Sequence, residues 1–564
     1  MRRSRRAFLW PMLLVFAAGC VMAGPDAPAR TAFDSGPAPT LAVKRVVVGV
    51  PREPDLHPDS GGGQGILLRT FLNPGLGTVD DQGVRRPVLA EAVPSLENGL
   101  WKLLPDGRME TTWTLRAGAH WHDGVPVTTE DLLFALQLGR HLPSFDSLAF
   151  RPIEEAIAVD ARTLTVRWKE PYIDADALFT TTVATPLPRH RLEAASRADP
   201  DGFPELPFWT DEYVGAGPYR VAAGTPGLGM NLRAFPDYVL GRPMVDEIEI
   251  RVISDPNAML ANILAGAVDV APILSSMEAG IQIRDQWRNG TVIFRVNNGG
   301  WLALYPQFIN PQPAVVADVR FRRALVHAVD RQSIADTLAF GMSPVAHTFV
   351  APNQPEYREI EAGIPHYDFD SRLAAQMLDD IGLRRAGDGT YRDATDIALD
   401  IELRSNPPGQ AVQTAETIAD TWRRLGVTTR SVGSSPAGLQ SAEYSATFPA
   451  FVVRTRPSNA VAVPTFHSSR TLLPENNFRV SRADNVSRYM NPALDALVDR
   501  YHATVPRPQR AQVLGEIASH VADQVVAAGI YYVAEPTAVA SRMLNVTPAE
   551  NATAWNSHAW DVRN

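Results

Sequence analysis

The stretch TWTLRAGAHWHDGVPVTTEDLLFAL, residues 112–136, contains the signals that decide how this chain folds. Bulky and polar residues alternate through residues 110–116, as they do in a half-buried strand. Asp123 begins an aspartate–glycine turn, and Thr128, followed three residues later by Asp131, predicts a helix N-cap. The stretch therefore predicts a strand, a turn and a capped helix.

The same stretch raises the question of a metal site. His120, His122 and Asp123 are all residue types that bind metals. Ligands adjacent in sequence, without a partner set elsewhere in the chain, are a weak indication of such a site. We interpret the segment as a loop whose polar residues serve the fold.

The glycine-rich residues 61–65, GGGQG, are not predicted to bind phosphate. They lack the spacing and the Lys-Ser/Thr ending of a phosphate loop.

Strands and helices continue to alternate along the rest of the chain. Short strands are predicted at residues 45–50, 164–168 and 247–253. One amphipathic helix is predicted to begin after a cap at Asp318, and another to end at Gly426. No segment repeats at a fixed period. The predicted class is therefore α/β in several domains.

The composition and net charge indicate which classes of function are compatible with this chain. The chain has 564 residues, of which 45% are hydrophobic and 20% charged, as in an ordinary soluble globular protein. This length is ample for several domains, large cores and a cleft between lobes. The formal net charge of -9 argues against a nucleic-acid partner, because nucleic-acid binders present a basic face.

The N-terminus predicts export. Four arginines and then a short apolar run indicate a signal peptide over residues 1–19. Residues 4–9 resemble a twin-arginine signal, although an ordinary secretory signal fits equally well. Cys20, the one cysteine of the chain, follows Ala-Ala-Gly and resembles the lipidated cysteine of a bacterial lipobox. Residues 20–40 are rich in Pro, Ala and Gly and are predicted to form a disordered tether that begins at the lipidated cysteine.

The order of several further blocks indicates a known family. After residues 112–136, these blocks are VGAGPYRV at 214–221, DVRFRRALVHAVDRQSI at 318–334, YMNPALDALVD at 489–499 and AWNSHAWDV at 554–562. Their sequence and order resemble the family 5 extracellular solute-binding proteins, the peptide- and nickel-binding group of ABC importers. The resemblance covers the whole predicted ordered chain.

The resemblance implies a fold like that of the type II periplasmic binding proteins, with two lobes built from three domains around a hinge and an interlobe cleft. Domain I would comprise residues 41–85, 200–300 and 520–564, domain II residues 86–199, and domain III residues 301–519. In such a fold the lobes close over the ligand by a hinge motion. His120 and His122 fall at variable positions of the family pattern, and no cofactor or metal is expected.

The implied function is that of a non-enzymatic, substrate-binding component of an ABC importer. The expected ligand is an oligopeptide or a peptide-like compound. The other expected partners are the permease subunits of the transporter and the membrane, reached through the lipid anchor; nucleic acid is not expected. The protein is expected to be a monomer, exported and either anchored to the outer face of the cell membrane or held in the periplasm.

The resemblance also suggests ligand-binding residues. The candidates are Phe71, Asn73, Trp301, Tyr305, Arg454 and Arg456. In peptide-binding members, an aspartate in a D-Y-x-D-P stretch pairs with the α-ammonium group of the peptide. The matching segment here, FPAFVVRTRPSNAVAVPTFHSS, has no acidic residue and carries the two arginines instead. These arginines either bind an anionic group of the ligand or pair with carboxylates of the protein.

Three alternatives remain open. A receptor for a non-peptide anionic solute, such as a sugar derivative or an opine-like compound, would also explain the two arginines. A secreted hydrolase is disfavoured, because the sequence has no G-x-S-x-G, no H-E-x-x-H and no cysteine after residue 20. A sensory or adhesive lipoprotein could use the same fold without transport.

Overall fold

The computed structural model describes residues 43–53, 56–57, 63–142, 148–181, 183–225, 228–274, 276–406, 409–480, 484–548 and 553–563. The predicted signal peptide, Cys20 and the predicted tether lie outside these ranges. The residues from Val43 to Asn564 form one compact unit by their contacts.

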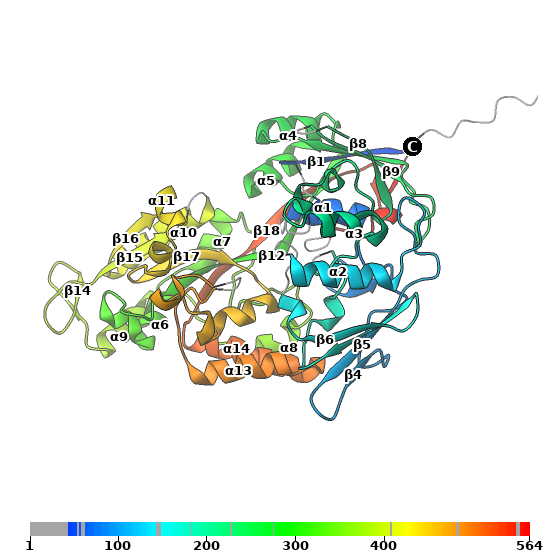
Figure 1. Cartoon of the computed structure of the whole chain (residues 1–564). Coiled ribbons are helices and arrows are strands. Elements are labelled where there is room, and N and C mark those ends of the chain that lie inside the picture. The colour runs from blue at the N-terminus through cyan, green and yellow to red at the C-terminus, as the bar shows by residue number, and fades with distance from the viewer. Residues whose placement is uncertain are drawn as a thin grey trace, which may run out of the picture. The chain divides into compact units, whose positions relative to one another are not determined.

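A ten-stranded mixed sheet forms the largest element of the fold (Figure 1). Its strands, in spatial order, are β16 (Thr428–Gly433), β15 (Asp400–Ser405), β17 (Phe451–Arg456), β12 (Gly290–Pro306), β18 (Ala528–Ala540), β11 (Val270–Ala271), β1 (Arg45–Val50), β10 (Glu247–Val252), β9 (Gly229–Ala234) and β8 (Tyr219–Thr225). Both parallel and antiparallel pairs occur in it, which confirms the predicted α/β class.

Two long strands, β12 and β18, join the two halves of this sheet. They run antiparallel and side by side from the Gly290–Ala540 pair to the Leu304–Ala528 pair (Figure 1). The register shifts between Val296 and Trp301, so the pairing is irregular midway along the strands. Strands from the N-terminal half of the chain therefore lie on one side of this pair, and β15, β16 and β17 lie on the other.

A separate antiparallel sheet contains the strand with which the stretch of residues 112–136 begins. Its strands are β4 (Trp101–Leu103), β5 (Met109–Thr114), β7 (Thr163–Trp168) and β6 (Ile153–Ala158). After β5 comes a turn and then helix α2 (Thr129–His141), so the predicted strand, turn and helix are confirmed. The backbone N–H of Thr128 donates to the carboxylate of Asp131 at 2.9 Å, as a helix cap should.

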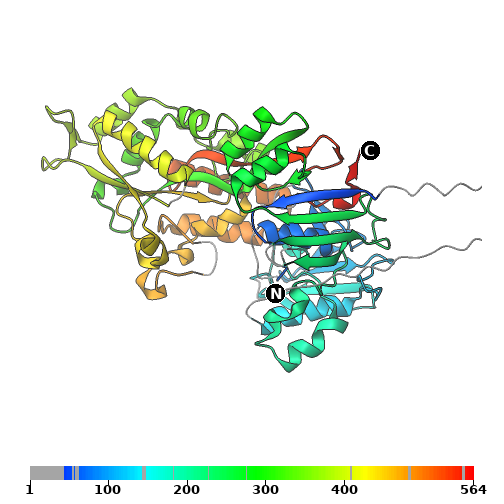
Figure 2. The same ribbon diagram turned by 90° about the horizontal axis from the view of Figure 1, so that it is seen from above.

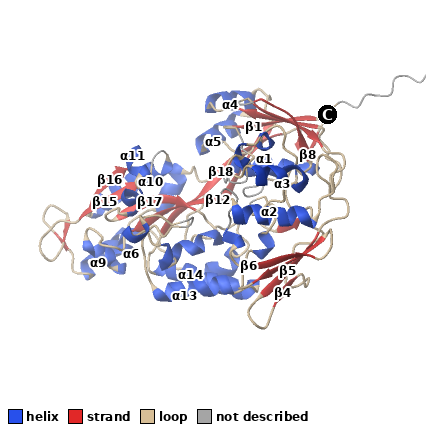
Figure 3. Cartoon of the chain, in the orientation of Figure 1, coloured by secondary structure: helices blue, strands red, loops and turns tan. Residues whose placement is uncertain are grey.

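Helices cover the sheets and alternate with strands along the chain, as Figure 3 shows by colour. The others of eight or more residues are α1 (Gly63–Leu72), α3 (Arg189–Ala198), α4 (Pro256–Leu264), α5 (Met277–Gln286), α6 (Val319–His327), α7 (Arg331–Leu338), α9 (Ser371–Asp380), α10 (Gln410–Leu425), α13 (Pro492–Ala503) and α14 (Arg507–Asp523). The shorter ones are α8 (Tyr357–Ile360), α11 (Pro436–Gln440) and α12 (Ala442–Ala446). Three small sheets add β2 (Gly77–Val79) with β3 (Arg85–Pro87), β13 (Arg384–Arg385) with β14 (Tyr391–Arg392), and β19 (Met543–Leu544) with β20 (Asp561–Val562).

Local signals in the sequence account for many of these boundaries. The side chain of Asp318 accepts a hydrogen bond from Arg320 N–H and caps α6, as predicted. Helix α10 ends at Gly426, which adopts the left-handed conformation at φ 103° and leads into β16. The predicted strands at residues 45–50, 164–168 and 247–253 are β1, β7 and β10, within one residue at each end.

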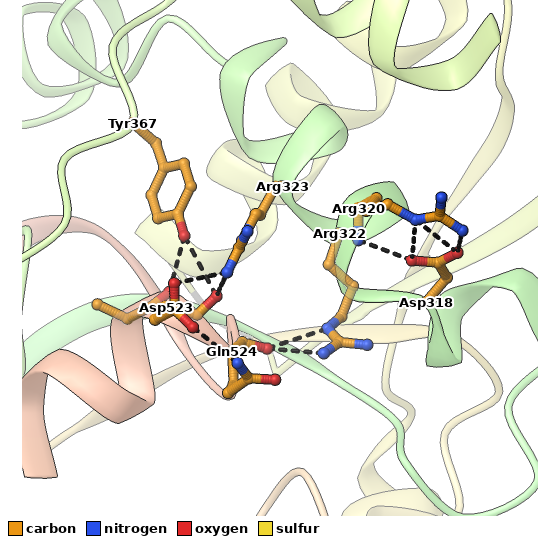
Figure 4. A network of polar contacts seen from close by, with 8 residues as sticks. Asp318, Arg320, Arg322, Arg323, Tyr367, Asp523 and Gln524 are labelled. Atoms are coloured by element: carbon orange, nitrogen blue, oxygen red, sulfur yellow. Dashed lines mark hydrogen bonds and ion pairs between the residues drawn. The ribbon is translucent and has the colours of Figure 1, made fainter. Parts of the chain in front are cut away.

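Two arginines of α6 donate hydrogen bonds to backbone carbonyls at the C-terminal end of α14 (Figure 4). Arg322 donates to the carbonyls of Val316 and Ala317 at 2.9 and 2.8 Å, and to the carbonyl of Gln524 at 2.7 Å. Arg323 donates to the backbone carbonyl of Asp523 at 2.8 Å. Cations favour the negative end of a helix dipole, so this arrangement stabilises the point where the chain leaves α14 and enters β18.

The first strands of the chain lie beside a segment from its middle. In the view of Figure 2, β1 in blue runs alongside green strands, in agreement with the parallel pairing of Val46 with Ile248 and of Val48 with Ile250. β18, near the C-terminus, pairs with β11, which in turn pairs with β1. Segments from three parts of the chain thus share one sheet, as the prediction of a discontinuous first domain requires. The domain boundaries themselves stay a prediction.

Candidate functional site

A pocket of about 600 Å³ lies where several of these segments meet. Asn406, directly after β15, and Arg454 and Arg456, at the end of β17, line it. Further walls come from the start of α5, the start of α10 and the middle of β18. β15 and β17 are parallel neighbours, so the pocket lies at their carboxyl ends. That is the usual position of ligand sites in open α/β sheets.

Four of the predicted site residues lie together at this place. In the β12–β17 register, Trp301 lies opposite Arg456, Ala303 opposite Arg454, and Tyr305 opposite Val452. Side chains that lie opposite each other on paired strands share a face of the sheet, and so do alternate residues of one strand. Trp301, Tyr305 and the two arginines therefore share one face.

The two arginines have different partners. Arg456 forms an ion pair with Asp484 at 2.6 Å. Arg454 donates to the backbone carbonyl of Ser445, in α12, at 2.5 Å. Its Nε is buried without a hydrogen-bond partner in the described part of the chain, and within the same part it has no carboxylate at ion-pair distance. The alternative interpretation, pairing with a protein carboxylate, thus describes Arg456 but not Arg454.

Burial makes the charge of Arg454 costly. The side chain is almost fully buried, and desolvation lowers the pKa of Arg454 to about 10, with repulsion from Arg456 as the next cause. A third arginine nearby, Arg404, is equally buried but is paired with Glu402 at 2.7 Å and stacks over Tyr444 at 4.0 Å. The described cluster therefore leaves one guanidinium group without a neutralising partner.

The aromatic candidates are buried in the core next to the arginines. Trp301 and Tyr305 are 1% and 5% exposed, and their rings meet edge to face with centroids 6.4 Å apart. Burial raises the pKa of Tyr305 far above its usual range, so its hydroxyl stays protonated. Neither residue is among those that line the pocket over the described residues. Their direct contact with a ligand stays a prediction.

Phe71 and Asn73 lie elsewhere, in the core beneath the N-terminal part of the large sheet. The ring of Phe71 packs edge to face against Tyr219 and Trp560. The side-chain amide of Asn73 donates to the carbonyl of Pro186 at 2.8 Å, and Asn73 is completely buried. Among the described residues, neither Phe71 nor Asn73 lines the pocket. Their role as ligand contacts also stays a prediction.

His122 is a structural residue. Its Nδ1 accepts a hydrogen bond from Gly215 N–H, and its Nε2 lies 3.1 Å from the carbonyl of Gly217. With both nitrogens occupied, the ring has no lone pair for a metal. His120 instead contacts the backbone of Gly118. No group of three or more His, Cys, Asp or Glu is placed to hold a metal ion in the described part of the chain.

Sequence reasoning missed the other walls of the pocket. Met277 and Glu278 begin α5, Gln410 and Gln413 belong to the first turns of α10, and Glu535 lies midway along β18. Asn406 and Gln410 follow the alternating stretch DIELRS of β15, which was not predicted as a strand. That alternation could have indicated them, because loops at carboxyl strand ends commonly bind ligands. The contribution of β18 had no local signal, since it depends on pairing with β12.

The sequence matches the family described as Bacterial extracellular solute-binding proteins, family 5 Middle, over residues 91–471. A protein of Brucella ovis named as an ABC transporter peptide-binding protein is 27% identical over 285 residues, which cover 50% of this chain and 50% of that protein. The match thus spans about half the length of this curated relative. Protein XP55 of Streptomyces lividans is 26% identical over 513 residues, covering 89% of this chain and 85% of the other.

Solved structures agree on the fold. The oligopeptide-binding protein AppA of Bacillus subtilis, in complex with a nonapeptide, superposes with a TM-score of 0.68 at 19% identity, covering 93% of this chain and 100% of AppA. This likeness confirms the predicted fold of the periplasmic-binding-protein type. Across the described residues, none of the helices has the length and apolar character needed to cross a membrane.

Proposed function

This chain belongs to family 5 of the bacterial extracellular solute-binding proteins, and on that premise we propose that it is the substrate-binding component of an ABC importer. The proposed ligand is an oligopeptide or a peptide-like compound. The observation that carries this proposal is the pocket at the carboxyl ends of β15 and β17. The peptide-binding names of its relatives support the same class of ligand.

The residues that line the pocket suit a site whose two sides close around the ligand. Glu278 belongs to α5, which follows β11, whereas Asn406 and Arg454 belong to segments on the opposite side of the β12–β18 pair. Glu535 lies on β18 itself. The long strands β12 and β18 carry the connection between the two sides, and their irregular pairing near Trp301 is a natural place for a hinge. Contacts made only after closure would shift the population toward the closed form.

The side chains of the pocket suit a peptide backbone. The amides of Asn406, Gln410 and Gln413 can each donate and accept hydrogen bonds. A peptide enclosed here loses water from its own N–H and C=O groups, and these groups must find partners in the protein. Backbone-directed hydrogen bonds would hold peptides of many sequences. In this account the ligand is bound and released without chemical change, and the protein is not an enzyme.

The place of work is outside the cytoplasm. We propose that residues 1–19 are removed after export and that Cys20 is lipidated. Residues 20–40 would then tether the folded part to the outer face of the membrane, next to the permease subunits. A protein held there as a monomer could deliver its ligand directly. The family to which the chain belongs is described as extracellular.

A thermal-shift comparison tests the proposed ligand class. A bound ligand stabilises the folded state, so its presence raises the Tm. We expect members of a library of short peptides to raise the Tm of the purified protein, and sugars to leave it unchanged. A Tm raised only by non-peptide carboxylates would refute the peptide proposal. It would support the second candidate, a receptor for an anionic non-peptide solute. Arg454 favours that candidate, because it has no carboxylate at ion-pair distance among the described residues.

A further inference from the structure

The charges around the end of β17 do not balance. Arg404 is paired with Glu402, and Arg456 with Asp484. Arg454, on the same face of the sheet, has only the carbonyl of Ser445 as a hydrogen-bond partner among the described residues. Among the described residues, only two of these three guanidinium groups therefore have a carboxylate at ion-pair distance. A buried cation without a counter-charge is unstable, and a bound anion would relieve that cost.

A second feature of the same pocket also favours negative charge. Helix α10 is 16 residues long, and its first turn lines the pocket through Gly409, Gln410 and Ala411. Gly409 stands at the N-cap and has no side chain to cap the helix, and the first turn has no acidic residue. The first backbone N–H groups of a helix and the positive end of its dipole attract an anion at such a position.

We propose that the pocket receives a carboxylate of the solute, held by the guanidinium of Arg454 and by backbone N–H groups at the start of α10. This inference rests on the proposed solute-binding function and names the chemistry of its ligand. The guanidinium plane can form two parallel hydrogen bonds with a carboxylate. The proposed site binds a negative group of the ligand, whereas the family resemblance implies a positive α-ammonium group at this place. An α-ammonium group would be repelled by Arg454.

The remaining charged groups of the pocket favour a ligand of mixed charge. Glu278 and Glu535 also line it, and both are exposed. These carboxylates would repel a second anionic group and attract a cationic one. The ligand that fits all of these charges carries one carboxylate and one positive group, as a short peptide with free termini does. Its carboxyl end would lie at Arg454.

The inference is tested with matched ligands and matched variants. Peptides that raise the Tm are compared with their C-terminal amides and with non-peptide monocarboxylates by isothermal titration calorimetry. The variants are Arg454→Gln, and Arg430→Gln as a control. Arg430 is an exposed arginine on β16 of the same sheet, and it pairs with Asp400 on β15. Both substitutions remove one positive charge, but only the first removes a pocket residue.

We expect the wild-type protein to bind the acids at least about tenfold more tightly than the amides, as a charge-assisted contact implies. Arg454→Gln should abolish that preference, and Arg430→Gln should retain it. A third variant, Arg454→Met, is measured without ligand. Its Tm should be no lower than that of the wild type, since the substitution removes a buried charge that has no carboxylate partner among the described residues. A merely structural arginine would give the opposite result for stability.

Each other outcome has a definite meaning. Equal affinity for acids and amides in the wild-type protein would overturn this inference and leave the peptide-binding function standing. Binding of non-peptide monocarboxylates alone, lost in Arg454→Gln, would overturn the peptide proposal and retain the carboxylate site. Binding by neither group of ligands would overturn both. Amide binding weakened by Arg454→Gln as much as acid binding would assign the arginine a purely structural role.

Discussion

The ring Nδ1 of His122 lies 3.1 Å from the backbone nitrogen of Gly215 and accepts its hydrogen bond. This contact ties the loop after β5 to the segment that leads into β8, 93 residues further along the chain. The other nitrogen, Nε2, donates to the carbonyl of Gly217. A neutral ring is required, because a proton on Nδ1 would face the N–H of Gly215.

The first prediction concerns the stability of the fold at low pH. Burial lowers the pKa of His122 from its usual 6.5 to about 4. Between these values the unfolded chain binds a proton that the folded chain excludes, so the free energy of unfolding falls as the pH falls from 6.5 toward 4. This residue should contribute about 2 kcal/mol to the loss between pH 7 and pH 5.

His122→Gln removes the titrating group and tests this assignment. At pH 7.5 the variant should be less stable than the wild type by about 1–3 kcal/mol, because it loses buried hydrogen bonds. Between pH 7.5 and pH 5 it should lose less stability than the wild type does. Urea unfolding at both pH values measures the difference, and parallel losses in the two proteins would show that His122 does not titrate in this range.

The second prediction concerns the contact between α6 and the end of α14. Arg322 is 2% exposed, donates to three backbone carbonyls and lies over the ring of Phe308 at 4.5 Å. Arg322→Ala would leave these carbonyls without partners and should cost about 2–4 kcal/mol in urea unfolding. Arg320→Ala on the same helix is the control. Its ion pair with Asp318 is exposed to solvent, so the loss in this variant should be much smaller than in Arg322→Ala. Equal losses in both variants would contradict the account.

The third prediction concerns the irregular centre of the β12–β18 pair. A Cβ at Gly300 would overlap the γ-methyl group of Thr455 and come within 3.3 Å of Val533. Gly300→Ala should therefore lower stability by about 1–3 kcal/mol through overpacking. Thr455→Ser deletes the methyl group, so the double variant should regain most of the loss. Independent, additive effects in a double-mutant cycle would show that the two residues do not meet.

The fourth prediction tests whether the pocket binds the solute. Ala411, in the first turn of α10, lines the pocket and is partly exposed. Ala411→Trp should occupy the space of the ligand and weaken peptide binding at least about tenfold, a loss of about 1.4 kcal/mol or more. Thr417→Trp places the same side chain on an exposed position of the same helix, away from the pocket. Calorimetric affinities that are unchanged in Ala411→Trp would place the ligand elsewhere.

The fifth prediction concerns the proposed lipid anchor. Cys20→Ser should abolish lipidation, so that the protein moves from the membrane fraction to the soluble exported fraction. The folded part should retain its Tm, because residue 20 lies outside the compact unit that begins at Val43. Mass spectrometry of the mature N-terminus measures the added lipid directly. An unmodified N-terminus in the wild-type protein would contradict the anchor.

Local signals predicted much of the fold. The alternation at β5, the cap at Asp318 and the left-handed Gly426 are decided by neighbours in sequence, and all three were predicted. The pairing of β12 with β18 was not predicted, because its partners are more than 200 residues apart and no local signal specifies the register.

Only part of the candidate site could be predicted from the sequence. Trp301 and Arg456 were both proposed from the family resemblance, and the β12–β17 register places them opposite each other. The sequence could not distinguish Arg454 from Arg456, because the difference depends on Asp484, a residue remote in sequence from both. Nor could the sequence reveal that α5 and α10 would form walls of the pocket.

Native mass spectrometry of the purified protein, stripped of ligand and then mixed with a peptide library, tests the central claim most directly. The account predicts a one-to-one complex that adds the mass of an intact peptide, and recovery of that peptide unchanged after denaturation. A protein that retains no peptide, or from which only cleavage fragments are recovered, would contradict it.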